Sequence, residues 1–237
     1  MADQPFLRRY ELQVAYDTAF LFMNFRGLVG ERWGHGPYFN AWGEQPGQVT
    51  FTSSATDQSL TGVVGIRVSS LIWHSPDTRD QAASLAENFL ADCVEVVKPR
   101  TVRNIIVKQH HILPTTEAEE LNGLLLADYP NLDGIIPPNY TESNSGLSFN
   151  ATEIHGSVTR RATAVVGIYL PGMAQAHFGH VEDDEPETAF GAFTETRSEG
   201  ELSLSEATQE ISRCIRRADS DADHVLSKTL RKYARNA

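Results

Sequence analysis

The amino-acid sequence predicts an α+β fold with a mostly antiparallel or mixed sheet, a central β-α-β unit and a long C-terminal helix. Short segments in which every second residue is hydrophobic recur along the chain, a pattern typical of half-buried strands. Two longer segments repeat hydrophobic residues at steps of three and four, which is typical of amphipathic helices. Together these segments favour a curved sheet that is shielded on one side by helices.

The central unit runs from Gly62 to Pro114 and contains a strand, a helix and a second strand. Alternating hydrophobic residues over 62–73 predict the first strand. Ser75-Pro76 then supplies a helix cap and a proline suited to the first helical position, and Pro99 ends the helix. The strand over 102–113 follows. Two arrangements stay open, a right-handed crossover between parallel strands and a helix packed over an antiparallel sheet.

Other elements are expected where the same patterns recur between residues that break regular structure. Ala19–Phe25 is expected to form a short helix or a second strand, and Gly27–Gly47 a loop rich in glycine and aromatic residues. In the strand expected at Arg161–Leu170, Ala162 and Ala164 share one face. The remaining expected elements are strands at Arg8–Tyr16, Gln48–Ser54 and Gly146–His155, an edge strand at Ala189–Thr196 and a helix over Thr116–Leu126.

The C-terminal helix is expected to run from Leu204 to about Ala234. Ser203 and Glu206 form a capping-box pattern at its start. At about 1.5 Å per residue, a helix of this length spans more than 40 Å. Because one sheet does not need so long a cover, we expect the helix to contact a protein partner or a second copy of the chain.

The length and the net charge of the chain limit the kind of protein that it can be. The 237 residues are enough for one large domain, within which a loop at 129–146 separates the halves 1–128 and 146–237. The net charge of −11 argues against nucleic acid as a partner, because phosphate binding is driven by clustered lysine and arginine.

Features of secreted and membrane proteins are not found in the sequence. Met1–Pro5 is not followed by the apolar segment of a signal peptide, and no apolar run approaches the roughly 20 residues that span a bilayer. We therefore expect a cytoplasmic protein without membrane contact. Cys93 and Cys214 lie on apolar helix stripes and no metal-binding cysteine spacing occurs, so both are expected to be buried free thiols.

Candidate catalytic residues are few, and none is assigned. The sequence contains no nucleophile elbow, dinucleotide fingerprint or Walker loop, so no cofactor is expected and an enzyme is not favoured. His177, His180 and Asp183 could hold a metal ion, but a solvated acidic loop explains this stretch better. His110 and His111 are neighbours in a strand, so their rings face opposite sides and are expected to be hydrogen-bonded structural histidines.

Three segments carry a resemblance to a known family. They are the first strand with Tyr10–Val14, the central unit from Ser75–Asp77 to Pro99–Arg103, and the closing helix Ala218–Tyr233 with its Ala-Asp-x-x-Leu-x-x-x-Leu pattern. In this order they resemble a family of sporadically distributed, uncharacterised bacterial proteins of similar length. The resemblance implies accessory genes, such as those for defence or of mobile elements, and no catalytic residues.

The leading hypothesis is a non-enzymatic interaction or assembly subunit. The long C-terminal helix and the aromatic loop Gly34–Trp42 are its expected contact surfaces. One alternative is a metal-dependent hydrolase or nuclease centred on His177, His180 and Asp183. A second alternative is a small-ligand sensor with a pocket between the sheet and the helices.

Overall fold

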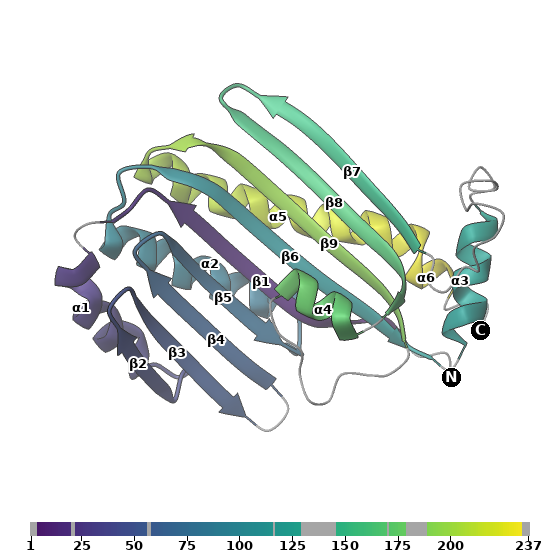
Figure 1. The fold of residues 1–237 in the computed structure, drawn as a ribbon, viewed down its shortest axis with the longest axis horizontal. Helices are drawn as coiled ribbons and strands as arrows, with labels where there is room; N and C mark the ends of the chain where they lie inside the picture. Colours follow the sequence, from purple (N-terminus) through teal and green to yellow (C-terminus); the bar gives the residue numbers. More distant parts are fainter. Residues whose placement is uncertain are drawn as a thin grey trace.

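A computed structural model describes residues 4–19, 22–55, 58–115, 117–128, 146–169, 171–178 and 189–233. In this part of the chain, nine strands form one sheet in the order β2-β3-β4-β5-β1-β6-β9-β8-β7 (Figure 1). The strands are β1 Phe6–Tyr16, β2 Ala41–Gln45, β3 Gln48–Ala55, β4 Gln58–Gly65, β5 Val68–His74, β6 Val102–Pro114, β7 Gly146–His155, β8 Val158–Tyr169 and β9 Ala189–Leu202. The helices are α1 Phe22–Gly34, α2 Arg79–Val97, α3 Ala118–Ala127, α4 Pro171–Phe178, α5 Leu204–Lys228 and α6 Leu230–Tyr233.

The observed architecture confirms the predicted α+β class, because every neighbouring pair of strands is antiparallel. In the central unit, α2 connects β5 to β6, and β1 lies between these two strands. Since β1 is antiparallel to both, β5 and β6 run parallel to each other but are not paired. The unit therefore combines the two arrangements that the sequence left open. Its two strands are parallel and are connected by a helix, and the sheet that contains them is antiparallel.

Helices α2 and α5 cover one face of the sheet, and the shorter α4 lies over the other (Figure 1). The buried stripe of α5 packs against β6 and β9 of its own chain, which leaves the opposite face of the helix for the expected contact with a partner. This stripe consists of Ala207, Glu210, Ile211, Cys214, Ile215, Ala218, Ala222 and Leu226. Both cysteines are free and buried, as predicted.

The prediction of a loop over Gly27–Gly47 was wrong. Helix α1 continues to Gly34, and β2 begins at Ala41. The glycines that suggested a loop make room for a side chain, because a Cβ at Gly30 would lie 2.7 Å from the ring of Trp42. Within the expected aromatic contact surface, Phe39 is buried against Phe51 and Phe89, whereas Tyr38 and Trp42 are exposed.

Two strand predictions also need correction. Residues 62–73 do not form one strand, because the chain reverses after Gly65 and continues as β5. The strand expected at the edge, Ala189–Thr196, is part of β9, which extends to Leu202 and lies between β6 and β8. Its side chains Thr194, Thr196 and Ser198 are buried, and α5 packs on this strand.

The helix ends differ from the prediction by a few residues. Helix α2 is capped by Thr78, whose hydroxyl accepts from the Gln81 amide, whereas Ser75 lies before it with a positive φ of 47°. The capping box of α5 is confirmed, with the Ser203 amide donating to Glu206 at 2.8 Å. Helix α5 ends at Lys228 rather than near Ala234, because the backbone at Thr229 leaves the helical conformation before α6 begins.

Candidate functional site

Strand β7 is the last strand of the sheet, and within the described part of the chain only β8 pairs with it. It is 10 residues long and pairs with β8 without a bulge. Natural edge strands are usually protected by lysine, proline, bulges or short length. Strand β7 has none of these, and it leaves Phe149 42% and Ile154 77% exposed. Within the described residues, no segment pairs with the outer edge of β7.

The turn between β7 and β8 fixes which residues of β7 point their backbone groups outward. Gly156 and Ser157 form a two-residue turn in which Gly156 has a φ of 61°, as a type II′ hairpin requires. The bond that closes such a turn joins His155 and Val158, which are therefore a hydrogen-bonded pair. Bonded and non-bonded pairs alternate along an antiparallel ladder. The residues with outward N–H and C=O groups are therefore Ser148, Asn150, Thr152 and Ile154.

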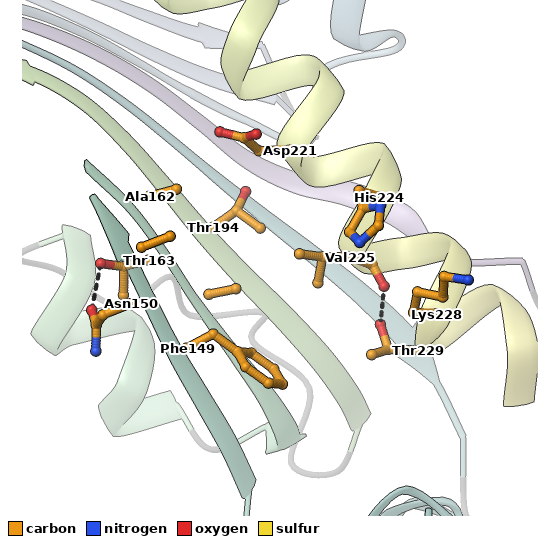
Figure 2. A pocket seen from close by; sticks show the side chains of 12 residues that line it. Phe149, Asn150, Ala162, Thr163, Thr194, Asp221, His224, Val225, Lys228 and Thr229 are labelled. Carbon is orange, nitrogen blue, oxygen red and sulfur yellow. Dashed lines mark hydrogen bonds between the residues drawn. The ribbon is translucent and has the colours of Figure 1, made fainter. Parts of the chain in front are cut away.

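A cleft of about 460 Å³ lies beside this edge, between α5 and the helix-facing side of β7 and β8 (Figure 2). Its floor is made of small side chains, because Ala151 pairs with Ala162, and Ala164 is the next residue of β8 on the same face. Phe149 and Val225 flank the floor. The residues that line the cleft are Phe149, Asn150, Ala151, Ala162, Thr163, Ala164, Thr194, Asp221, His224, Val225, Lys228 and Thr229.

The polar groups of the cleft are carried mainly by α5. The Thr196 hydroxyl donates to Asp221 at 2.9 Å, and the Thr229 hydroxyl donates to the Val225 carbonyl at 2.7 Å. His224 and Lys228 lie one turn apart at the mouth (Figure 2), and in the described ranges neither side chain has a hydrogen bond or an ion pair. Lys228 occupies the last turn of α5, where the helix dipole favours a cation.

A second hollow of about 370 Å³ continues along α5 from Asp221. It is lined by Arg160, Arg213 and Arg217 together with Cys214 and Ser220. These arginines are engaged with carboxylates. Glu210, which is only 3% exposed, accepts from Arg160 at 3.3 Å and from the Ser198 hydroxyl at 2.9 Å.

Arg217 contacts Glu153 of β7 at 2.5 Å. Because Arg217 lies on α5 and Glu153 on β7, this ion pair bridges the hollow from helix to strand. The arginines of the second hollow are thus engaged in internal ion pairs, whereas Lys228 of the cleft has no ion pair within the described residues.

A partly buried polar cluster connects α2 and β6 to α5 on the same face of the sheet. The Gln109 amide donates to Asp219 at 2.7 Å, and Arg79 donates to Asp223 at 2.9 Å. Burial raises the pKa of Asp219, and burial together with the Asp219 charge raises the pKa of Tyr10. Since Tyr10 and Gln109 are fully buried, we interpret this cluster as a clamp between the helices rather than as a reaction centre.

The opposite face carries the histidines that the sequence singled out. The ring of His110 lies against Tyr169 and Phe178, while His111 faces Arg79 on the helix side, so the two rings point to opposite faces as predicted. The Nδ1 atom of each has no hydrogen-bond partner in the described part of the chain, contrary to the expectation of hydrogen-bonded histidines. Burial lowers the pKa of both rings to about 3.

The predicted metal residues are only partly described. His177 stacks on Phe193 with ring centroids 3.7 Å apart, and its carbonyl accepts from Lys108. His180 and Asp183 lie outside the described residues. Within the described residues, no three histidine, cysteine or acidic side chains are placed to hold a metal ion.

Comparison with protein-family models finds no match, and neither does comparison with curated proteins. None of the helices in the described ranges combines the length and the apolar character that crossing a bilayer requires.

Proposed function

We propose that the protein is a non-enzymatic assembly subunit that pairs through β7 with a second copy of itself. The observation that supports this proposal is the outer edge of β7, which has no strand partner within the described residues, is 10 residues long and exposes Phe149 and Ile154. Strand addition satisfies a row of backbone donors and acceptors and removes apolar side chains from water.

The side chains of β7 fit a two-fold antiparallel pairing centred on Ala151. In this register Asn150 lies opposite the second copy's Thr152, and Ser148 lies opposite the second copy's Ile154. Glu153, which keeps its own Arg217, faces the second copy's Phe149 and not its own equivalent, so like charges do not meet. At the axis Ala151 faces itself as a closely spaced non-bonded pair, for which its small side chain is suited.

Replacing Thr152 by proline should convert the dimer into a monomer, because it removes an outward N–H of β7 while sparing the bonds to β8. Size-exclusion chromatography with light scattering measures this directly on the full chain. Ala151→Pro is the control: its N–H faces β8, so it should lower the unfolding temperature, whereas Thr152→Pro should not. A wild-type chain that stays monomeric at about 100 µM, well above a micromolar Kd, would rule out the second copy.

A cysteine at position 151 tests the register. The two native thiols are buried, so a new disulfide between chains can come only from the introduced residue. Non-bonded antiparallel pairs have Cα atoms about 4.5 Å apart, which lies within the range of disulfides. Ala151→Cys should therefore form covalent dimers on mild oxidation, and Ile154→Cys should not, because Ile154 faces the second copy's Ser148.

A small-ligand sensor is a second candidate function. The cleft of about 460 Å³ favours it, because small-molecule sites are concave and mostly apolar, with volumes of about 300–1,000 Å³. Ligand binding does not depend on the pairing of β7, so the two functions can be tested separately.

A further inference from the structure

We infer that the cleft between α5 and the β7–β8 hairpin is a binding site for a small amphipathic anion. The apolar body of the ligand lies on the alanine floor, and its carboxylate or similar head group lies at Lys228. The site is formed by described residues of a single chain and does not require the pairing proposed above.

The apolar part of the site is an open space that larger side chains would fill. Three alanines, Ala151, Ala162 and Ala164, meet on neighbouring strands beneath α5, so the helix has no bulky residue to pack against there. The space is open to solvent, because Ala151 is exposed and Ala162 is half-buried. Figure 2 shows Phe149 and Val225 on opposite sides of this floor, where each can contact a flat or linear apolar body.

The head group is specified by the charges along α5. Lys228 and His224 are the polar groups at the mouth whose side chains have no protein partner in the described ranges. The acidic Asp221 also lines the cleft, but it is seven residues from Lys228, about 10 Å along the helix. Asp221 is also engaged by Thr196. An anionic head is therefore favoured at the Lys228 end and disfavoured at the Asp221 end.

The charge of the whole chain adds selectivity. With a net charge of −11, the protein repels anions over most of its surface, so a bound anion needs a local cation. A lysine at the apolar mouth of the cleft attracts the anion more strongly than a lysine in bulk water would, because the apolar body of the ligand excludes solvent from the contact. The ligand class is therefore a monoanion with an aliphatic or aromatic body, such as a medium-chain carboxylate.

Octanoate and octan-1-ol form a pair of probes that differ in the head group alone. Isothermal titration calorimetry of the full wild-type chain should show octanoate binding at one site. The alcohol should bind about three- to tenfold more weakly, the range expected for a partly screened charge contact. Equal affinities would overturn the anionic head group, and the absence of binding by either probe would overturn the site.

Substitutions in and outside the cleft test whether octanoate binds there. Ala162→Leu fills part of the floor and should weaken octanoate binding about tenfold or more, and Ala164→Leu should do the same if Ala162→Leu does not fold. Thr159→Leu adds similar bulk to the other face of β8 and should leave binding unchanged. Lys228→Gln should remove the preference for octanoate over octan-1-ol, whereas Arg100→Gln, an equal charge change at an exposed position, should retain it.

The monomeric Thr152→Pro variant separates this inference from the proposed function. It should bind octanoate with unchanged affinity, because Thr152 does not line the cleft. If both leucine variants bound octanoate as tightly as the wild type, the cleft would not be the site, whatever the oligomeric state of the protein.

Discussion

Replacing Phe89 by alanine is expected to lower the free energy of unfolding by about 3–5 kcal/mol, the range for deleting a fully buried phenylalanine side chain. Phe89 is on α2 and is completely buried. Its ring lies 5.1 Å from that of Trp33, 5.8 Å from that of Phe39 and 5.9 Å from that of Phe51. These neighbours come from three other parts of the chain, so they cannot all move inward to fill the cavity. Urea denaturation measures the loss as a shift of the midpoint.

Phe149→Ala is the matched control, because it deletes the same atoms from a side chain that is 42% exposed. Its effect should stay below about 1 kcal/mol in the monomeric background. A second variant tests the packing directly. A Cβ at Gly62 would lie 2.8 Å from the Phe89 ring, so Gly62→Ala should cost less when Phe89 is already alanine. Strictly additive costs would contradict the packing described for this cluster.

The amphipathic helices and the strands with clear alternation could be predicted because burial imposes a period on the sequence. Strand β7 was predicted with its observed bounds, and α5 was predicted with its observed start and capping box. Predictions failed where the role of a residue is not reflected in the spacing of hydrophobic residues. Gly30 and Gly34 were interpreted as loop residues, yet they make room for Trp42, and this contact between α1 and β2 leaves no local signal.

The candidate site could not be predicted, because it depends on which strands are neighbours in the sheet and on the register between them. Ala162 and Ala164 were placed on one face of their strand, but the cleft exists because Ala151 of another strand lies beside them. The register between β7 and β8 follows from the turn at Gly156, which has a positive φ, and the edge position of β7 follows from the order of all nine strands. Lys228 lies in the last turn of α5, where the helix dipole alone favours a cation, so its position in the sequence does not reveal the cleft beside it.

Acidification from pH 6.5 to 5 is expected to destabilise the protein through His110 and His111. Burial holds the pKa of each near 3, whereas the unfolded value is about 6.5. Between these values the unfolded state binds more protons, so stability is complete above pH 6.5 and falls as the pH drops. Each histidine contributes at most about 1.4 kcal/mol per pH unit, or about 4 kcal/mol for both over this range. Urea midpoints at pH 7, 6 and 5 measure the trend.

Two buried carboxyls act in the opposite direction and must be separated from the histidines. Burial raises the pKa of Glu11 and of Asp219, so their protonated forms stabilise the fold at low pH and this contribution is lost as the pH rises. The histidine part is therefore the difference between the wild type and a His110→Phe, His111→Gln double variant. The phenylalanine introduced at position 110 keeps the aromatic contacts with Tyr169 and Phe178. The variant should lose much less stability than the wild type below pH 6.5. If both lost the same amount, neutral buried histidines would not be the source of acid sensitivity.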